Sequence, residues 1–493
     1  MAEKKVIRYK LERHKWPDEI EAEKKEKRRK RTVVLSCIAC FVVGIVVHSM
    51  WDGLMHTGGD RSKFNDVYHI MKNQFYFSNE IEDIDDTLMN GAISGMVNAG
   101  GDQHTMYMDE KMASDFTSSM EGSIVGIGVT MYELDDSTFI ISDVLKDSPA
   151  LKADVHPGDQ IMEVDGTSVK GMDIDQLVSV VRGESGSQVT LTLLRDGVNI
   201  EKTIVREQVY GTVFSQILED TAVIELTTFA DTSGKEFGRH LEDLKKANVN
   251  QIIIDLRGNG GGYLQSALEI ASYFIPENKV IFKEQHADGS VEDYYTIDYL
   301  PRFDFDQVYV LVDGGTASAS EALTGALKEQ ANAIVVGTKT YGKGTVQIPY
   351  TFDDGSMIKY TIAEWMTPQG HKINKVGIVP DVVVEQNKAF TTPMPRLEKD
   401  EEYQADSVNV AAQSVQIYLQ FLGYAADRED AYFSYASSQA LKQYQLDHGL
   451  QADGVIRAEV CNSLVSQVIR AQKAEPLRYD TQLKKAMDLA HGN

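Results

Sequence analysis

The segment VLVDGGTASASEAL, residues 310–323, decides the fold of the central part of the chain. An apolar run that ends at Val312 is typical of a buried strand, a glycine turn follows, and small residues then open a helix. This order predicts Ser318 at a strand-to-helix turn, where helix N–H groups stabilise developing negative charge. Ala317 and Ala319 leave room for a substrate carbonyl. Since serine at a helix start is usually an N-cap, this segment alone does not establish catalysis.

A lysine between two glycines follows in the stretch TKTYGKGTVQ, residues 338–347. Lys343 can act as a general base only when neutral, and with a reference pKa near 10.4 only about one lysine in 2,500 is neutral at pH 7. Burial would therefore have to lower its pKa by roughly three pH units. The neighbouring glycines and apolar strands could supply such a dry pocket. Gln347 is a candidate to orient the amine through its side-chain amide.

A third glycine-rich stretch, IIIDLRGNGGG, spans residues 252–262. It runs from an apolar strand towards a helix, but it satisfies neither of the two phosphate-loop patterns, GxGxxG and GxxxxGK[ST]. Gly261 or Gly262 could instead offer a backbone N–H as a second oxyanion donor. Strands and helices alternate over residues 215–385, which predicts an α/β core with ligand sites at the strand ends.

The N-terminal region predicts a membrane anchor. Residues 32–51, TVVLSCIACFVVGIVVHSMW, hold no Lys, Arg, Asp or Glu, and about twenty helical residues span a bilayer core. The basic run at 27–31 should stay cytoplasmic, which puts the body of the chain outside. The net charge of −25 is unevenly distributed, because residues 1–31 hold 13 Lys/Arg and only 7 Asp/Glu. The rest of the chain is therefore strongly acidic, which argues against nucleic acid as a partner.

The remaining stretches differ in their patterns. Five short strand patterns with a helix between them describe a small, partly open β-barrel, and the stretch EGSIVGIGV (121–129) opens it. The expected domains are a cytoplasmic tail (1–31), the transmembrane helix (32–51), a helical arm (61–118), the barrel (121–207), a peptidase core (208–390 with 61–118), a linker (391–405), a helical domain (406–472) and a C-terminal tail (473–493). The arm could act as a lid or form a homodimer contact, and its composition leaves both open.

Taken together, the motifs of residues 61–390 resemble the carboxyl-terminal processing, or tail-specific, peptidases. The matching motifs are DQHTMYM (102–108), the GIGV turn, SPA (148–150), PGD (157–159), DLRGNGGG, TASASE and YGKGTVQ. The barrel resembles a PDZ domain, and VQIYLQFLGY (415–424) with ALKQYQLDHGL (440–450) resembles a peptidoglycan-binding domain. The fold class expected is therefore multidomain α+β with an N-terminal transmembrane helix.

The resemblance implies roles for individual residues. Ser318 is the expected nucleophile, Lys343 its base and Gln347 the third member, with the backbone N–H groups of Gly262 and Ala319 as oxyanion donors. The PDZ likeness implies that a substrate's free C-terminus binds at Ile127, Gly128 and Val129, with Arg182 as a candidate that couples tail binding to active-site alignment. No cofactor and no metal are expected. The expected partners are protein tails and the membrane, with peptidoglycan and a second copy of the chain as candidates.

Three other interpretations of the sequence compare with a tail-specific peptidase. A Ser-His-Asp hydrolase is disfavoured because no GxSxG turn surrounds Ser318. A penicillin-binding type of site needs Ser-x-x-Lys on a helix, whereas Ser356 and Lys359 lie in a β-patterned run that puts them on opposite faces. The third is a catalytically silent scaffold that holds partners through its PDZ and wall-binding domains. The expectation is a single-pass protein of the bacterial cell membrane with an extracytoplasmic catalytic body.

Overall fold

The computed structural model describes residues 16–33, 36, 43, 59–120, 123–135, 138–146, 148–210, 212–397 and 400–492. It divides into two compact units, Met1–Met96 and Val97–Asn493. In the first unit, residues 17–33 are helical, and α2 (Gly59–Asn73), the 3-10 turn η1 (Ser78–Glu80) and α3 (Ile84–Asn98) follow. An ion pair of 2.6 Å between Lys72 and Asp85 joins α2 to α3.

The expected fold class is wrong in one respect, the transmembrane helix. Within the described ranges, no helix has both the length and the apolar character that crossing a bilayer requires. The described helical stretch 17–33 is rich in Lys, Arg and Glu and fully exposed, and charged side chains are costly in hydrocarbon. Of the expected span 32–51, only residues 32, 33, 36 and 43 are described, and the rest lies outside the described residues.

The PDZ-like domain is built on an antiparallel sheet in the order β3-β4-β5-β7-β8, with β6 beside β5. Its elements are β2 (Ser123–Gly126), β3 (Val129–Asp135), β4 (Thr138–Val144), α5 (Pro149–Lys152), β5 (Gln160–Val164), β6 (Thr167–Ser168), α6 (Ile174–Val181), β7 (Gln188–Arg195), β8 (Val198–Val205) and β9 (Glu207–Tyr210). Gly128 has a φ of 78° and turns the chain between β2 and β3.

The peptidase core contains a six-stranded sheet in the order β10-β11-β12-β15-β16-β19, parallel except for the β10-β11 pair. Its strands are β10 (Val213–Leu218), β11 (Thr221–Leu226), β12 (Gln251–Asp255), β15 (Gln307–Val312), β16 (Ile334–Gly337) and β19 (Val382–Val383). Alternate residues pack into two separate cores, so Ile252 and Ile254 lie on one face and Ile253 on the other. Burial on both faces explains why these strands are continuous apolar runs.

Helices cover the face of this sheet that carries Ile252 and Ile254, and a second sheet lies beside these helices. The helices are α7 (Ser233–Lys246), α8 (Leu264–Ser272) and α9 (Ala319–Gln330). The second sheet is antiparallel, in the order β1-β18-β13-β14 with β17 beside β18. Its strands are β1 (Met106–Met108), β13 (Val280–His286), β14 (Val291–Tyr295), β17 (Thr345–Thr351) and β18 (Met357–Met366), and α4 (Glu110–Met120) follows β1. Strand β17 begins directly after the Lys343 loop, so this sheet positions the candidate base.

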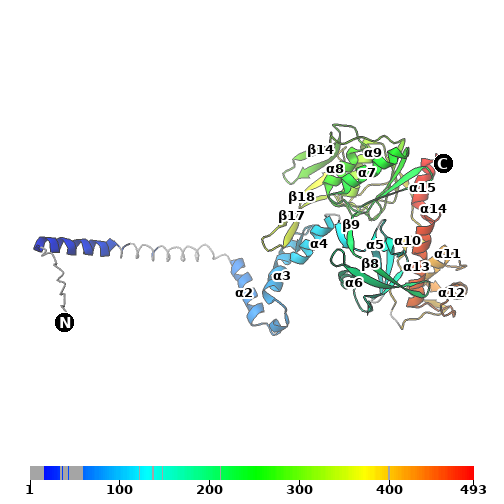
Figure 1. The fold of residues 1–493 in the computed structure, drawn as a ribbon, viewed down its shortest axis with the longest axis horizontal. Coiled ribbons are helices and arrows are strands. Elements are labelled where there is room, and N and C mark those ends of the chain that lie inside the picture. Colours follow the sequence, from blue (N-terminus) through cyan, green and yellow to red (C-terminus); the bar gives the residue numbers. More distant parts are fainter. Residues whose placement is uncertain are drawn as a thin grey trace, which may run out of the picture. The chain divides into compact units, whose positions relative to one another are not determined.

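The C-terminal part is helical and ends on the peptidase core (Figure 1). Its elements are α10 (Lys388–Thr391), β20 (Ser407–Val408), α11 (Ala412–Phe421), β21 (Tyr432–Phe433), α12 (Tyr435–Asp447), α13 (Ala458–Ala474), α14 (Pro476–Tyr479) and α15 (Thr481–Ala490). Residues 473–493, expected as a tail, therefore include α15, whose Leu483, Ala486, Met487 and Ala490 cover the second face of the parallel sheet.

Candidate active site

Ser318 lies at the turn between β15 and α9. Its backbone has φ 57° and ψ −117°, a conformation that residues with a side chain seldom adopt and that costs of order 1–3 kcal/mol. The surrounding turn holds this conformation, since the Thr316 hydroxyl donates to the Leu256 carbonyl at 2.8 Å and the Ala317 N–H donates to the Asn259 carbonyl at 3.0 Å. Strain of this kind, maintained by neighbouring hydrogen bonds, is typical of a functional site.

The glycine loop 258–262 lies directly against this turn. A Cβ on Gly261 would come within 2.8 Å of the Ser318 Cβ and 2.9 Å of the Ala319 nitrogen, so only glycine fits there. In the described part of the chain, neither the Gly262 N–H nor the Ala319 N–H donates a hydrogen bond to another residue. The structure therefore brings Ser318, Ala319 and Gly262 together with two unused backbone donors, which is the arrangement that an oxyanion hole needs.

Glu321 connects the candidate nucleophile to the loop that carries the candidate base. Its carboxylate is fully buried and accepts hydrogen bonds from the backbone N–H of Ser318 at 2.9 Å and of Lys343 at 2.9 Å. It also accepts from the Gly342 N–H at 2.8 Å and from the Thr340 hydroxyl at 2.5 Å. One side chain thus joins two chain segments that β16 separates, and it sets their spacing.

Replacing Glu321 with glutamine should reduce the turnover number by about 10²-fold or more, the effect expected of a small misplacement of reacting groups. The amide would direct an NH₂ at backbone donors, and each buried donor left without an acceptor costs about 1–3 kcal/mol. The measurement is cleavage kinetics together with thermal unfolding. Glu329→Gln is the matched control, because Glu329 lies on the same helix and accepts from the Gln369 N–H outside the site. Full activity of the Glu321 variant would contradict this role.

Lys343 is half-buried, and its electrostatic surroundings disfavour its charged form. Burial lowers the pKa of the Lys343 amine, and the nearby positive charge of Lys359 lowers it further, against the opposing effects of Asp102 and Glu321. Lys359 is itself a half-buried cation, whose pKa is also lowered by burial. Both effects increase the fraction of neutral Lys343, which is the form that a general base requires.

Gln347 belongs to a hydrogen-bond network beside this lysine. Its amide nitrogen donates to the Thr345 hydroxyl at 2.6 Å and to the Thr361 hydroxyl at 3.3 Å. The Thr361 hydroxyl donates in turn to Asp102 at 2.5 Å. Although burial alone would raise the pKa of Asp102, the hydrogen bonds from Thr105 and Thr361 lower it. Because the amide nitrogen is occupied, the side-chain oxygen of Gln347 is the atom that remains to accept from a lysine amine.

The residues expected to bind a peptide tail line a cavity of about 270 Å³ in the PDZ-like domain. Ile127, Gly128 and Val129 form one wall, and Val178 and Val181 of α6 form another. Arg182, which ends α6, also borders this cavity. The cavity extends to Thr227 and Thr228 of the peptidase core, and the Thr228 hydroxyl donates to the Gly261 carbonyl at 3.2 Å. An apolar side chain and a carboxylate fit this combination of valines and glycine N–H groups.

Sequence reasoning missed Glu321, Asp102 and Lys359. The spacing Ser-x-x-Glu was a usable signal for Glu321, since it is the spacing of a capping box. Asp102 lay inside a recognised motif but had no role assigned to it, and Lys359 appeared only in the rejected Ser-x-x-Lys pattern. Across the described residues, no group of three or more His, Cys, Asp or Glu side chains could hold a metal ion.

A strained serine at a helix start, two unused N–H donors and a lysine with a lowered pKa together define a serine hydrolase. Family models match four segments: the N-terminal domain of the activating protease CtpB (residues 46–112), a PDZ domain (115–194), peptidase family S41 (220–384) and a peptidoglycan binding domain (410–464). The chain belongs to the carboxy-terminal processing proteases of family S41 and is a serine-type peptidase. The resemblance seen in its motifs is confirmed.

Two curated relatives and one solved structure illustrate this relationship. The carboxy-terminal processing protease CtpA of Bacillus subtilis (strain 168) is 33% identical over 462 residues, which cover 92% of this chain and 96% of the relative. CtpB of the same organism is 33% identical, over 86% of this chain and 88% of the relative. The photosystem II D1 C-terminal processing protease aligns with a TM-score of 0.41 and 26% identity, over 64% of this chain and 88% of that one.

Proposed function

We propose that this peptidase cleaves proteins that it recognises by their free C-terminal tails, through an acyl-enzyme formed on Ser318 with Lys343 as general base. The observation that carries the proposal is the Glu321 carboxylate, which binds the backbone N–H groups of both residues. The neutral Lys343 amine accepts the proton of the Ser318 hydroxyl, and the serine oxygen attacks the scissile carbonyl. The N–H groups of Gly262 and Ala319 stabilise the resulting oxyanion.

The protonated lysine then completes the acylation, and attack by water follows. The protonated Lys343 donates its proton to the leaving amine, which departs and leaves an acyl ester on Ser318. Water then loses a proton to the neutral lysine and attacks the ester. As the ester bond breaks, the lysine returns this proton to the Ser318 oxygen, and the second product is released with a free carboxylate. In this proposal the side-chain oxygen of Gln347 accepts a hydrogen bond from the lysine amine and so orients it.

The tail-binding role rests on the PDZ-like cavity. Its valine walls fit an apolar terminal side chain, and the backbone N–H groups around Gly128 fit the terminal carboxylate. The catalytic body acts outside the cytoplasm on this proposal, which the match of residues 410–464 to a peptidoglycan binding domain supports. Peptidoglycan binding and homodimer formation stay predictions.

The experiment compares an unstructured protein that ends in an apolar residue with the same protein carrying a C-terminal carboxamide. The free tail should be cleaved at least about tenfold faster at low substrate concentration, since removing one charged hydrogen-bond partner costs about 1.5–3 kcal/mol. Val178→Asp should erase this preference, because it puts a carboxylate into the cavity wall. Val180→Asp is the matched control, because Val180 lies on the same helix, is 39% exposed and does not line the cavity.

The outcomes separate the candidate functions. Equal cleavage of both tails by the unmodified protein would remove tail recognition and leave the peptidase. Absence of cleavage of either tail would favour the scaffold function, in which the PDZ-like and helical domains hold partners without cutting them.

A further inference from the structure

Residues 458–490, named here the C-terminal strap, connect the helical domain to both other parts of the second unit (Figure 1). The strap consists of α13, α14 and α15, with no long loop between them. α13 packs in the core of the helical domain through residues such as Leu464, whereas α15 packs on the parallel sheet of the peptidase core through residues such as Met487. The strap therefore belongs to two hydrophobic cores at once.

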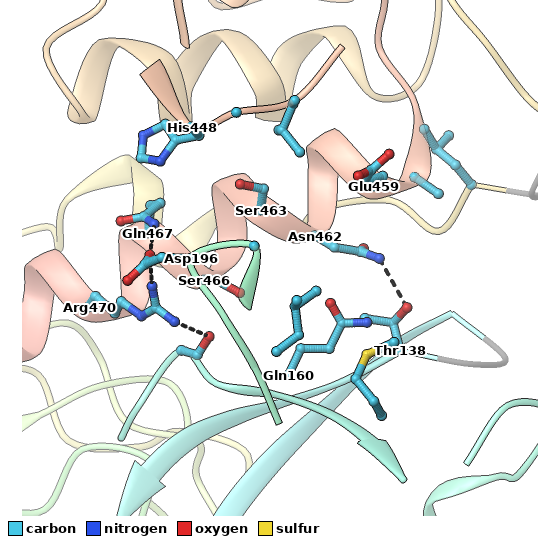
Figure 2. Close-up of a pocket in the computed structure, with 18 of the residues that line it drawn as sticks. Thr138, Gln160, Asp196, His448, Glu459, Asn462, Ser463, Ser466, Gln467 and Arg470 are labelled. Atoms are coloured by element: carbon cyan, nitrogen blue, oxygen red, sulfur yellow. Dashed lines mark hydrogen bonds and ion pairs between the residues drawn. The ribbon is translucent and has the colours of Figure 1, made fainter. Parts of the chain in front are cut away.

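The first half of the strap is fastened to the PDZ-like domain, beside a cavity of about 700 Å³ (Figure 2). The Arg470 guanidinium donates to the Gly158 carbonyl at 3.1 Å and pairs with Asp196. Asn462 donates from its amide nitrogen to the Thr138 hydroxyl at 3.0 Å. These contacts join side chains about two turns apart on α13 to strand ends and turns of the PDZ-like sheet.

Through Asp480, the second half of the strap contacts Arg257, the residue directly before the glycine loop 258–262. This residue is the N-cap of α15, where its carboxylate accepts from the Leu483 N–H at 2.9 Å. The same carboxylate pairs with the Arg257 guanidinium, with Nη1 2.9 Å from Oδ1 and 2.8 Å from Oδ2. The Asp480 side chain is only 7% exposed and that of Arg257 only 17%. In an ion pair this well shielded from water, removal of one charge is costly, because it leaves the other charge buried and less well compensated.

Arg257 directly precedes the glycine loop 258–262. On its other side, the Arg257 guanidinium donates two hydrogen bonds to the Asp255 carboxylate, from Nε at 2.9 Å and from Nη2 at 2.6 Å. The loop itself is joined to the nucleophile turn, because the Asn259 carbonyl accepts from the Ala317 N–H at 3.0 Å and from the Ser320 hydroxyl at 2.9 Å. A shift of Arg257 is therefore passed on to the backbone that presents Gly262.

We propose that Asp480 is a positioning residue for the peptidase reaction, and that the C-terminal strap is in this way part of the support of the oxyanion loop. Asp480 holds Arg257 between two carboxylates, and Arg257 holds the first residues of the loop. Through the same strap, the placement of the PDZ-like domain is connected to that of the loop. The inference rests on the proposed role of the Gly262 N–H as an oxyanion donor.

The test is Asp480→Asn in the full chain. Asparagine caps helices as well as aspartate does, so α15 should remain in place while the charge that holds Arg257 is lost. We expect kcat to fall by about 10²-fold with KM nearly unchanged, as a displacement of about 1 Å at the reacting groups produces. The rate of acyl-enzyme formation from an activated ester should fall by the same factor. Asp480→Glu, which keeps the charge, should recover part of the loss.

Two control variants assign the cause. Asp488→Asn removes a carboxylate from the same helix, where it pairs with the exposed Lys484, and should leave kcat unchanged. Met487→Ala loosens the packing of α15 but keeps the ion pair. Wild-type kcat for Asp480→Asn would overturn the inference, and so would an equal loss in Met487→Ala. Each of these results leaves the Ser318 mechanism standing, whereas full activity of Ser318→Ala would remove the mechanism itself.

Discussion

Ser318→Ala should lower peptide cleavage by about 10³-fold or more, the loss expected when the nucleophile of an acyl-enzyme mechanism is removed. The buried Ser318 side chain lies against the glycine loop, and in the described structure the N–H groups of Gly262 and Ala319 donate no hydrogen bond. Alanine fits the same turn, so the fold and the binding of tails should persist. The measurement is cleavage of an unstructured protein, together with mass spectrometry for a trapped acyl-enzyme, which the variant should not form.

Ser320→Ala is the matched control for this experiment. Ser320 is also buried at the start of α9, but its hydroxyl donates to the Asn259 carbonyl at 2.9 Å and is not available as a nucleophile. Its variant should lose stability of about 1 kcal/mol, the contribution of a typical hydrogen bond. Because that hydrogen bond also joins the glycine loop to the nucleophile turn, cleavage should slow, but the acyl-enzyme should still form. If both variants cleaved as fast as the unmodified protein, neither hydroxyl would be the nucleophile.

Lys343→Ala should stop acylation, with a loss of the same order, about 10³-fold, because no base would then accept the serine proton. Lys343→Arg should fail as well, since arginine cannot deprotonate in a protein. Lys339→Ala serves as the control, because Lys339 is an exposed lysine of the same loop. Single-turnover acylation of each variant provides the measurement, and an active arginine variant would contradict a lysine base.

The dependence of acylation on pH follows from the direction of the Lys343 pKa. The neutral amine is the active form, so the rate should rise with pH through the Lys343 pKa and level off above it. Because burial and Lys359 lower that pKa, the rise should lie below 10.5, the usual value for lysine. Lys359→Met removes one of the two causes and should move the rise to higher pH. A rate that did not change between pH 5 and pH 9 would exclude Lys343 as the base.

Local sequence patterns were sufficient for the nucleophile turn and for the peptidase sheet. The apolar run before Asp313, the two glycines and the small residues after them specify strand, turn and helix from neighbouring residues alone. The helix that the small residues open is α9, Ala319–Gln330, and the apolar strand before the third glycine-rich stretch is β12, Gln251–Asp255. Such elements are predictable because hydrogen bonding and burial within each one depend on periods of two or about four residues.

Tertiary structure decided the groups that link these elements. Glu321 meets the backbone of Gly342 and Lys343 only because β15 and β16 pair in parallel. Asp102 and Lys359 act on Lys343 only because β18 pairs with both β1 and β17. Asp480 binds Arg257 across 223 positions of the chain. No periodic pattern carries such information, because contacts between distant segments arise when apolar faces pack, and the packing then determines which buried charges become neighbours.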